Sequence, residues 1–322
     1  MRVLLVGLGY WGAKHLRVLR ELGVDVWVAE VVPARREWAV GQGLAPGRVV
    51  ADFHHALAHV DAVDIVTEAD RHAPIAAVAL GAGRHCFVEK PLAVTVVEGR
   101  MLAAAARAAD RVLQVGHIFR FHPVTAAVKR ALYADRIGRV RFATGRFSGF
   151  KRPRTDVGVT HTDSLHYFDL FAYLFGRRAT RVAALQRDFL GRGLDDMSVT
   201  LVRYGDIDTI VEANYFVPTT HRECVIVGDR GSLVADYGAN TVTLHAGRHE
   251  RRADAWEAVA AGKEDLPTVG GEPLRVELEA FRAACAGSAP SPVSAEDGVH
   301  ALEVSEAATR AAALGGAIAL EA

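Results

Sequence analysis

The 322-residue sequence has no excess of charge of either sign. Lysine plus arginine and aspartate plus glutamate each number 38, so the formal net charge at pH 7 is zero. Proteins that bind nucleic acids or anionic membranes usually carry a basic excess or a basic patch. The balance of charge therefore predicts neither nucleic acid nor a membrane surface as a partner.

Cysteine is scarce, and its three copies are far apart and without metal-ligand spacing. Such a set predicts neither a disulfide framework nor a zinc site. His54, His55 and His59 lack a cysteine or an H-E-x-x-H context, so we expect them at the surface and expect no metal. Reduced core thiols in a cytoplasmic protein are predicted at Cys86, Cys224 and Cys285.

Long hydrophobic runs are also missing, since no uninterrupted apolar stretch reaches the length of a membrane span. The apolar start, MRVLLVGLGYWG, is short, is broken by glycines and precedes no small-residue cleavage site, unlike a signal sequence. Half of all residues are nonetheless hydrophobic. The chain is therefore long and apolar enough to form two domains with sizeable cores.

The first thirty residues show a pattern typical of dinucleotide binding. A short apolar run at 3–6 is followed by GLGYWG and by an amphipathic stretch over 11–22. In this G-x-G-x-x-G spacing, Gly7 makes the tight turn and Gly9 lets a pyrophosphate approach the backbone. Gly12 allows close packing of helix on strand, and the helix N-terminus receives the phosphates.

The next predicted strand, VDVWVAE at 24–30, ends on an acidic residue. Glu30 lies about twenty residues after the glycine turn, where a carboxylate accepts a hydrogen bond from a ribose hydroxyl. A carboxylate there repels a 2′-phosphate, so NAD is predicted as the cofactor and NADP is less favoured. Arg35 and Arg36 follow closely and weaken this preference.

Strands continue to alternate with helices, which predicts a parallel sheet with right-handed crossovers. Lys90 follows the last residue of one such strand and precedes Pro91, where helical backbone is disfavoured. We therefore expect Lys90 at the carboxyl end of a strand, the edge at which doubly wound sheets bind ligands. The predicted strands are 60–67, 85–89 and 112–116, and the helices are 72–80 and 94–108.

Several stretches carry a resemblance to the Gfo/Idh/MocA oxidoreductase family over nearly the whole chain. They are VGLGYWG (6–12), GRHCFVEKPLA (83–93), VGHIFRFHP (115–123), DVGVTHTDSLHYFDLFAYLFG (156–176), EANYFVPTTHRECVIVGDRGSLVADY (212–237), EPLRVELEAF (272–281) and EDGVHALEVSEAA (296–308). The E-K-P motif after a dinucleotide-binding unit is highly specific. The D-V-G-V stretch, the H-x-x-D helix and EANYFVP are similar to members that act on nucleotide-linked sugars.

The resemblance implies an α/β protein with two domains. Residues 1–120 would form a Rossmann domain with a doubly wound parallel sheet. Residues 121–322 would form an α/β domain with a large, mostly antiparallel open sheet, one face of which the family commonly buries in a homodimer or homotetramer. The residues agree, because a predicted helix at 124–133 precedes short strand-like segments at hairpin spacing.

The stretch at 160–176 is predicted to be a helix capped by Thr162 or Asp163. His166 would then lie in its first turn, where the helix dipole disfavours a charged imidazole. A neutral histidine suits proton exchange with a substrate hydroxyl. Taken alone, His166 is more typical of a capping or core residue. The resemblance places it on the H-x-x-D position, with Asp169 as the residue that orients its ring.

The sequence departs from the family at the position four residues before this histidine. The family usually has an aspartate there, whereas this chain has Thr162 with Asp163 next to it. A threonine cannot act as a base at neutral pH. Either Lys90 and His166 suffice, or Asp163 takes the role.

Other candidate residues are polar side chains near these motifs. His72 opens a predicted helix and is also consistent with a simple cap. The basic loop with Arg146, Lys151, Arg152 and Arg154 suits a diphosphate but equally suits a solvated loop. Expected cofactor-binding residues are Gly7, Gly9, Tyr10, Trp11, Gly12, Glu30, Thr67, His72, Glu89 and Lys90. Expected substrate-binding residues are Lys90, His117, Arg120, Arg146, Arg154 and His166, with His122 as a weaker candidate, and the catalytic set is Lys90, His166, Asp163 and Thr162.

These residues predict an NAD(P)-dependent dehydrogenase or reductase that acts on CH–OH groups. A hydride would pass between nicotinamide and a carbinol or ketone of a sugar, with a nucleotide-linked sugar as first choice. Lys90 would polarise the oxygen, and His166 would exchange its proton. Alternatives are an inositol or free-sugar dehydrogenase, a glycoside hydrolase that retains NAD, and a non-catalytic dinucleotide-sensing protein.

Overall fold

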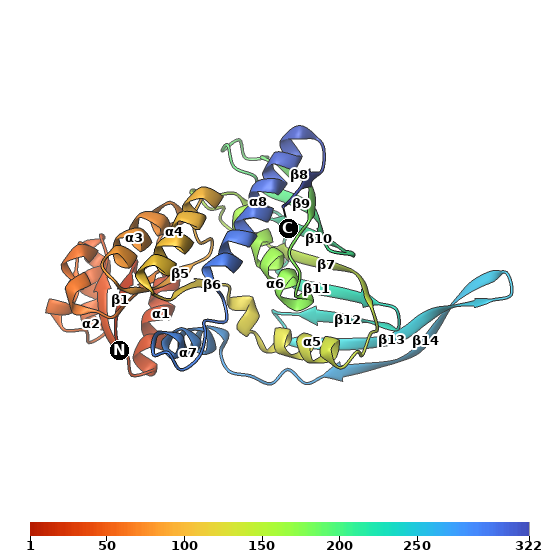
Figure 1. The fold of residues 1–322 in the computed structure, drawn as a ribbon, viewed down its shortest axis with the longest axis horizontal. Coiled ribbons are helices and arrows are strands. Elements are labelled where there is room, and N and C mark those ends of the chain that lie inside the picture. The colour runs from red at the N-terminus through yellow and green to blue at the C-terminus, as the bar shows by residue number, and fades with distance from the viewer. Residues whose placement is uncertain (322) are drawn as a thin grey trace. The chain divides into compact units, whose positions relative to one another are not determined.

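The computed structural model describes residues 1–321, and the chain forms two compact units (Figure 1). Unit 1 comprises Met1–Ile118 and Glu272–Leu302, and unit 2 comprises Phe119–Gly271 and the residues from Glu303 onward. The segment 272–302 packs with unit 1. The boundary predicted at residue 120 instead puts this segment in the second domain. That domain division stays a prediction.

Unit 1 contains a six-stranded sheet of order β3-β2-β1-β4-β5-β6. Every pair of neighbouring strands is parallel. The order reverses between β1 and β4, which is the topological switch point of a doubly wound fold. The predicted parallel sheet is therefore confirmed. The strands are β1 (Arg2–Val6), β2 (Asp25–Ala29), β3 (Val49–Val50), β4 (Ala62–Ile65), β5 (His85–Glu89) and β6 (Leu113–Gly116).

The helices of unit 1 follow the predicted pattern with two differences. The second helix was not predicted; it is short and buries only Ala39. The third begins at Ala69, three residues before the predicted start. The helices are α1 (Tyr10–Glu21), α2 (Pro33–Gly41), α3 (Ala69–Gly81), α4 (Val96–Ala109) and α7 (Pro273–Cys285), and α8 (Ala295–Leu314) runs from unit 1 into unit 2.

The core of unit 1 explains why residues far along the chain belong to it. Val3, Leu5 and Phe87 of the sheet lie in one cluster with Leu278 and Phe281 of α7. The Phe87 and Phe281 rings meet edge to face, with centroids 5.6 Å apart. Burial of such large aromatic side chains is a dominant stabilising term, so α7 completes this core.

Unit 2 contains a nine-stranded sheet of order β14-β13-β12-β11-β7-β10-β9-β8-β15. Only β7 and β10 pair in parallel, so the sheet is mostly antiparallel, as predicted. Strands β8, β14 and β15 were not predicted. The strands are β7 (Val140–Ser148), β8 (Arg181–Arg187), β9 (Met197–Tyr204), β10 (Ile207–Asn214), β11 (His221–Gly228), β12 (Gly231–Asp236), β13 (Thr241–Arg252), β14 (Ala255–Leu266) and β15 (Ile318–Ala319).

The two faces of this sheet differ. On β7, Ala143 and Phe147 are buried, and Tyr167 of α6 (Leu165–Phe175) packs over Gly145. Successive side chains of a strand point to opposite faces, so Phe142, which is exposed, lies on the other face. Helix α5 (Pro123–Tyr133) precedes β7 in the chain.

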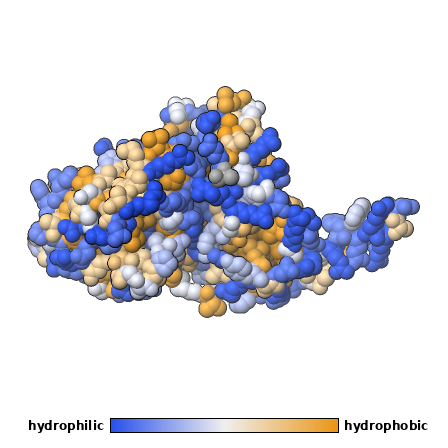
Figure 2. All heavy atoms as spheres, in the orientation of Figure 1, coloured by the Kyte–Doolittle hydropathy of each residue, from blue (hydrophilic) through white to orange (hydrophobic). Residues whose placement is uncertain are grey.

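Strands β13 and β14 extend beyond the rest of the sheet as a hairpin (Figure 1). Strand β12 pairs with β13 only as far as Ala246, and the remaining residues of β13 pair with β14 alone. The projecting part is mostly hydrophilic (Figure 2).

Candidate active site

The glycine turn of unit 1 has the geometry that a bound pyrophosphate needs. Gly7 has a φ of +93°, and a Cβ there would lie 2.7 Å from the Val66 carbonyl oxygen. A Cβ on Gly12 would lie 2.1 Å from the Gly7 oxygen, whereas a Cβ on Gly9 would meet nothing within 4 Å. Gly9 is the N-cap of α1 and supplies no side-chain cap. The open space at Gly9 and the helix N-terminus fit a dinucleotide phosphate.

Glu30 follows β2 and is almost fully buried. Its two carboxylate oxygens accept hydrogen bonds from the backbone N–H of Leu8 at 2.7 Å and of Val32 at 2.8 Å. Each oxygen keeps a further lone pair. The carboxylate is thus held rigidly where a ribose hydroxyl would donate, while Arg35 lies 3.6 Å away. Arg36 instead donates to the carbonyl oxygen of Glu30.

Lys90 lies directly after β5, as predicted. It is half-buried, its peptide bond to Pro91 is cis, and its backbone N–H donates to the Glu89 carboxylate at 3.1 Å. His72 lies inside α3 and does not cap it. Its ring nitrogens face the carbonyl oxygens of Pro91 at 2.7 Å and Thr67 at 3.1 Å. His72 therefore ties the segment after β4 to the segment that carries Lys90.

Glu89 belongs to a buried polar cluster that the sequence reasoning missed. Its carboxylate accepts from Trp11 Nε1 at 2.7 Å and lies 3.3 Å from His15 Nε2. The other ring nitrogen of His15 lies 2.9 Å from Asp64. His15 follows Trp11 by one helical turn on α1, and that spacing is the only sequence signal that it faces the same side.

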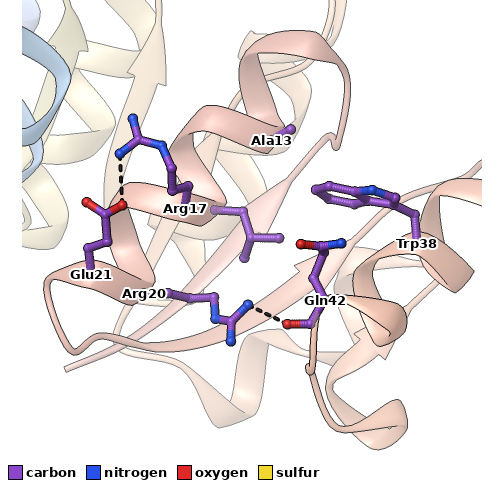
Figure 3. Close-up of a pocket in the computed structure, with 7 residues that line it drawn as sticks. Ala13, Arg17, Arg20, Glu21, Trp38 and Gln42 are labelled. Atoms are coloured by element: carbon purple, nitrogen blue, oxygen red, sulfur yellow. Dashed lines mark hydrogen bonds and ion pairs between the residues drawn. The ribbon is translucent and has the colours of Figure 1, made fainter.

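A pocket of about 400 Å³ lies between α1 and α2 of unit 1 (Figure 3). Its cations are already engaged, because Arg17 pairs with Glu21 and Arg20 donates to the Gln42 carbonyl oxygen. It contains none of the predicted site residues. The lining residues are Ala13, Leu16, Arg17, Arg20, Glu21, Trp38 and Gln42.

The start of the histidine helix in unit 2 differs from the prediction. Residues Thr160–Ser164 form a π-helical segment that continues directly into α6. Thr162 and Asp163 are therefore inside the helical segment, and the predicted cap at either residue is wrong. His166 lies beyond the first turn of this segment, so the dipole at its N-terminus no longer supports a neutral imidazole. Gly176 ends α6 in the left-handed conformation.

His166 is buried, and its ring packs against two aromatic rings that also contact each other. The centroid of Phe119 is 4.8 Å away and that of Phe147 is 5.1 Å away, both in stacked arrangements. Phe119 also stacks on Tyr237 at 4.5 Å. Aromatic packing, which no sequence spacing indicated, thus fixes the orientation of the imidazole.

Asp163 is paired with a lysine that had been only a weak candidate. Lys151 Nζ lies 2.7 Å from the Asp163 carboxylate and 4.8 Å from the centroid of Phe147. Burial lowers the pKa of Lys151, and the attraction of Asp163 offsets part of this effect. Thr162 donates to the Gly158 carbonyl oxygen at 3.1 Å, and its hydroxyl lies 3.2 Å from that of Tyr215.

The remaining predicted residues of unit 2 are mostly engaged in ion pairs. Arg120 donates through two nitrogens to Asp169, and both side chains are buried. Asp169 is thus committed to a cation, and its predicted role of orienting His166 stays a prediction. Arg154 pairs with Asp156.

Arg146 is separated from His166 by the sheet. It follows Gly145 and precedes Phe147, whose ring contacts His166, so its side chain points to the opposite face. There it lies 3.4 Å from Glu212. The structure therefore does not bring Arg146 together with the predicted substrate-binding residues.

The other predicted histidines have local roles. His117 is buried in unit 1, and His122 accepts from the Val124 N–H as the N-cap of α5. His54, His55 and His59 are exposed, as predicted. Within residues 1–321, no group of three or more potential ligands could hold a metal ion. In the same range, no helix combines the length and the hydropathy that a membrane span needs.

Comparison with known families agrees with this geometry. Residues 1–117 match the oxidoreductase family with an NAD-binding Rossmann fold, and residues 129–320 match its C-terminal α/β domain. The chain belongs to this Gfo/Idh/MocA family, and it is an NAD-binding oxidoreductase.

Three relatives illustrate the breadth of the family. A D-apiose dehydrogenase of Paraburkholderia graminis is 29% identical over 66% of this chain and 60% of its own length. An inositol 2-dehydrogenase of Saccharopolyspora erythraea is 28% identical over 98% of this chain and 94% of its own length. A UDP-N-acetylglucosamine 3-dehydrogenase of Acidithiobacillus ferrooxidans is 31% identical over 58% of each chain. A solved structure of that enzyme superposes with a TM-score of 0.81 at 25% identity, over 97% of both chains.

Proposed function

We propose that this protein oxidises a carbinol, or reduces the matching ketone, of a sugar. NAD supplies the nicotinamide that accepts or donates the hydride. The observation that carries the proposal is Lys90, which directly follows β5 of the NAD-binding sheet in an E-K-P motif. The carboxyl edge of such a sheet is where its ligands bind.

In this proposal, the chain's own residues handle charge and protons. Lys90 donates a hydrogen bond to the substrate oxygen and so stabilises the charge that develops as the hydride leaves or arrives. His166 exchanges the proton of that oxygen. The Phe119 and Phe147 rings hold the imidazole, and Thr162 cannot act as a base. The Asp163 carboxylate pairs with Lys151 and so is not a ready substitute for the missing family aspartate.

The first candidate substrate is a nucleotide-linked sugar. The similarity to a UDP-N-acetylglucosamine 3-dehydrogenase over nearly the whole chain supports it. One structural observation favours a second candidate, an inositol or free sugar. Arg120, Arg154 and Lys151 each pair with a carboxylate of this chain, so a diphosphate would compete with existing ion pairs.

A substrate panel separates these candidates. Purified protein is mixed with NAD and with UDP-, GDP- or dTDP-sugars, inositols or free sugars, and NADH is followed at 340 nm. Net NADH formation with one class identifies the substrate. Glycoside cleavage without added NAD would identify a redox-type hydrolase, and NAD binding without either reaction would identify a sensor.

Two further proposals concern assembly and location. We propose a homodimer or homotetramer that covers the face of the unit 2 sheet on which Phe142, Leu201 and Ile210 are exposed. Light scattering of the purified protein tests it, and a monomer would contradict it. The three cysteines are free thiols, which supports a cytoplasmic location.

A further inference from the structure

Unit 1 buries three ionisable side chains that contact one another, and one of them, Glu89, directly precedes Lys90. His15 and Asp64 are completely buried, and Glu89 is 7% exposed. His15 Nδ1 lies 2.9 Å from Asp64 Oδ2, and His15 Nε2 lies 3.3 Å from Glu89 Oε1. The three residues come from α1, the centre of the sheet and the end of β5. Helix α1 is the helix that opens at the glycine turn.

The geometry identifies His15 as a cation. Both of its ring nitrogens face carboxylate oxygens, and only an imidazolium donates from both nitrogens. Burial alone would lower the pKa of His15, but Asp64 and Glu89 outweigh it and raise the pKa to about 10. These two carboxylates raise the pKa of the ring. Burial raises the pKa of Asp64 as well, and the charge and hydrogen bond of His15 offset part of that effect.

Packing alone does not explain this cluster. Buried charges lose their hydration, and replacing a buried ion pair by apolar side chains is often neutral or stabilising. The ring lies 5.7 Å from that of Phe87, within the apolar core. Asp64 Oδ1 finds no hydrogen-bond partner within residues 1–321, so the hydration that it loses is not fully replaced.

The cluster leads directly to Lys90. Glu89 Oε2 accepts the backbone N–H of Lys90 at 3.1 Å, and Glu89 Oε1 accepts from Trp11 at 2.7 Å. A Cβ on Gly116 of β6 would lie 3.0 Å from the Glu89 carboxyl carbon, so there is no room for a side chain at that position. Burial raises the pKa of Glu89, but the hydrogen bond and charge of His15 outweigh this effect and lower it, and the charge of Lys90 lowers it further.

We propose that His15 is a positioning residue for Lys90, a buried counter-cation that neutralises Glu89 and so weakens the attraction of Glu89 for the Lys90 amine. Without His15, Lys90 would be the main cation facing Glu89 and would be held by it more tightly. The proposal rests on the proposed function only for the statement that Lys90 acts in catalysis. It also gives α1 a second role, because the helix that opens at the cofactor turn supplies this cation.

The first experiment is steady-state kinetics of His15→Gln. We expect kcat to fall about tenfold or more while the sugar KM and the NAD Kd change less than about twofold, since an oriented donor is weakened and the binding residues stay. Lys90→Met identifies the limb of the pH–rate profile that reports the titration of Lys90. In His15→Gln this limb should move to higher pH by about one unit, because a nearby positive charge is lost. Adding Asp64→Asn to His15→Gln removes one carboxylate and should reverse part of both changes.

The second experiment does not depend on turnover. The sequence has only five lysines, Lys14, Lys90, Lys129, Lys151 and Lys263. Reductive methylation with ¹³C-formaldehyde gives each one an NMR signal that can be titrated, and Lys90→Met assigns the signal of Lys90. In His15→Gln this signal should titrate at higher pH than in the wild type. Asp64→Asn alone should shift it in the opposite direction, which keeps the test available if His15→Gln does not fold.

His85→Gln is the matched control, because it removes a partly buried histidine at the opposite end of the same strand. It should leave kcat and the Lys90 titration unchanged. An unchanged Lys90 titration in both His15→Gln and Asp64→Asn would overturn the inference. If no sugar is oxidised but the Lys90 titration shifts as expected, the proposed function fails and the electrostatic inference stands.

Discussion

The two units each bury a histidine, and the two histidines have opposite surroundings. His15 of unit 1 faces two carboxylates, which raise its pKa to about 10. His166 of unit 2 packs against the rings of Phe119 and Phe147. A histidine between carboxylates is a fixed cation at neutral pH, whereas aromatic rings beside a histidine carry no charge that would fix its protonation state. The same side chain thus serves charge placement in one unit and, as we propose, proton exchange in the other.

The largest effect is expected when Lys90, the lysine beside the ionic cluster, is removed. Lys90→Met keeps the length of the side chain and deletes its charge, so turnover should fall on the order of a hundredfold or more. The NAD Kd should change little, because Gly9 and Glu30 are untouched. Steady-state kinetics and calorimetric titration measure the two quantities. Near-normal turnover of this variant on the true substrate would show that Lys90 has no catalytic role and is only a solvated residue at the end of a strand.

The ionic nature of the His15 site should be visible in stability against pH. Its pKa rises from an ordinary value of 6.5 to about 10 on folding, so the stabilising contribution is complete below pH 6.5 and is lost as the pH rises toward 10. At neutral pH, His15→Gln should lower the free energy of unfolding by about 3–5 kcal/mol, as expected when one partner of a buried pair is removed.

Urea unfolding between pH 6 and pH 10 measures this difference. The difference in the free energy of unfolding between wild type and His15→Gln should become steadily smaller with rising pH. His85→Gln provides the comparison, because burial lowers the pKa of His85 instead of raising it. A gap that stays constant over this range would show that His15 is neutral in the folded protein.

In unit 2, His166→Asn should lower turnover about tenfold to a hundredfold, since water can replace part of a general acid–base function. Phe119→Leu leaves the imidazole but removes one of its stacking partners, so we expect a smaller loss of turnover. The two variants are compared at saturating sugar. If Phe119→Leu lowers turnover as much as His166→Asn does, the orientation of the imidazole is as important as its ability to exchange a proton.

A smaller effect is expected from restoring the family aspartate. Thr162→Asp introduces a carboxylate that cannot donate to the Gly158 carbonyl oxygen as the hydroxyl does, so stability should fall by about 1–3 kcal/mol. Activity should survive, because Lys90 and His166 stay in place. Thermal unfolding and turnover are measured beside Thr162→Val, which removes the hydroxyl without adding charge. A folded but inactive Thr162→Asp would contradict the expectation.

The smallest effect concerns cofactor choice in unit 1. Glu30 should make NAD bind about tenfold more tightly than NADP, through repulsion of the 2′-phosphate, with Arg35 reducing the difference. Fluorescence titration gives both dissociation constants. Tighter NADP binding by the wild type would overturn the role of Glu30.

The sequence by itself determined the features that depend on local pattern. The alternation of strands and helices predicted the parallel sheet. The glycine spacing and the acid after β2 predicted the cofactor turn, and the lysine before Pro91 predicted the place of Lys90, because backbone geometry near glycine and proline is set locally. The strands of unit 2 were readable where their hydrophobic residues alternate. Strand β14 was missed because most of its residues are exposed and show no such alternation.

Only the tertiary structure decided which side chains meet. The pairing of Lys151 with Asp163, the engagement of Asp169 by Arg120 and the position of Arg146 on the opposite face all depend on how the helices pack on the sheet of unit 2. In the buried cluster, His15 contacts Asp64 and Glu89, which lie 49 and 74 positions further along the sequence. A charge in the core is stabilised only by partners that folding brings to it, so its role cannot be read before the fold is known.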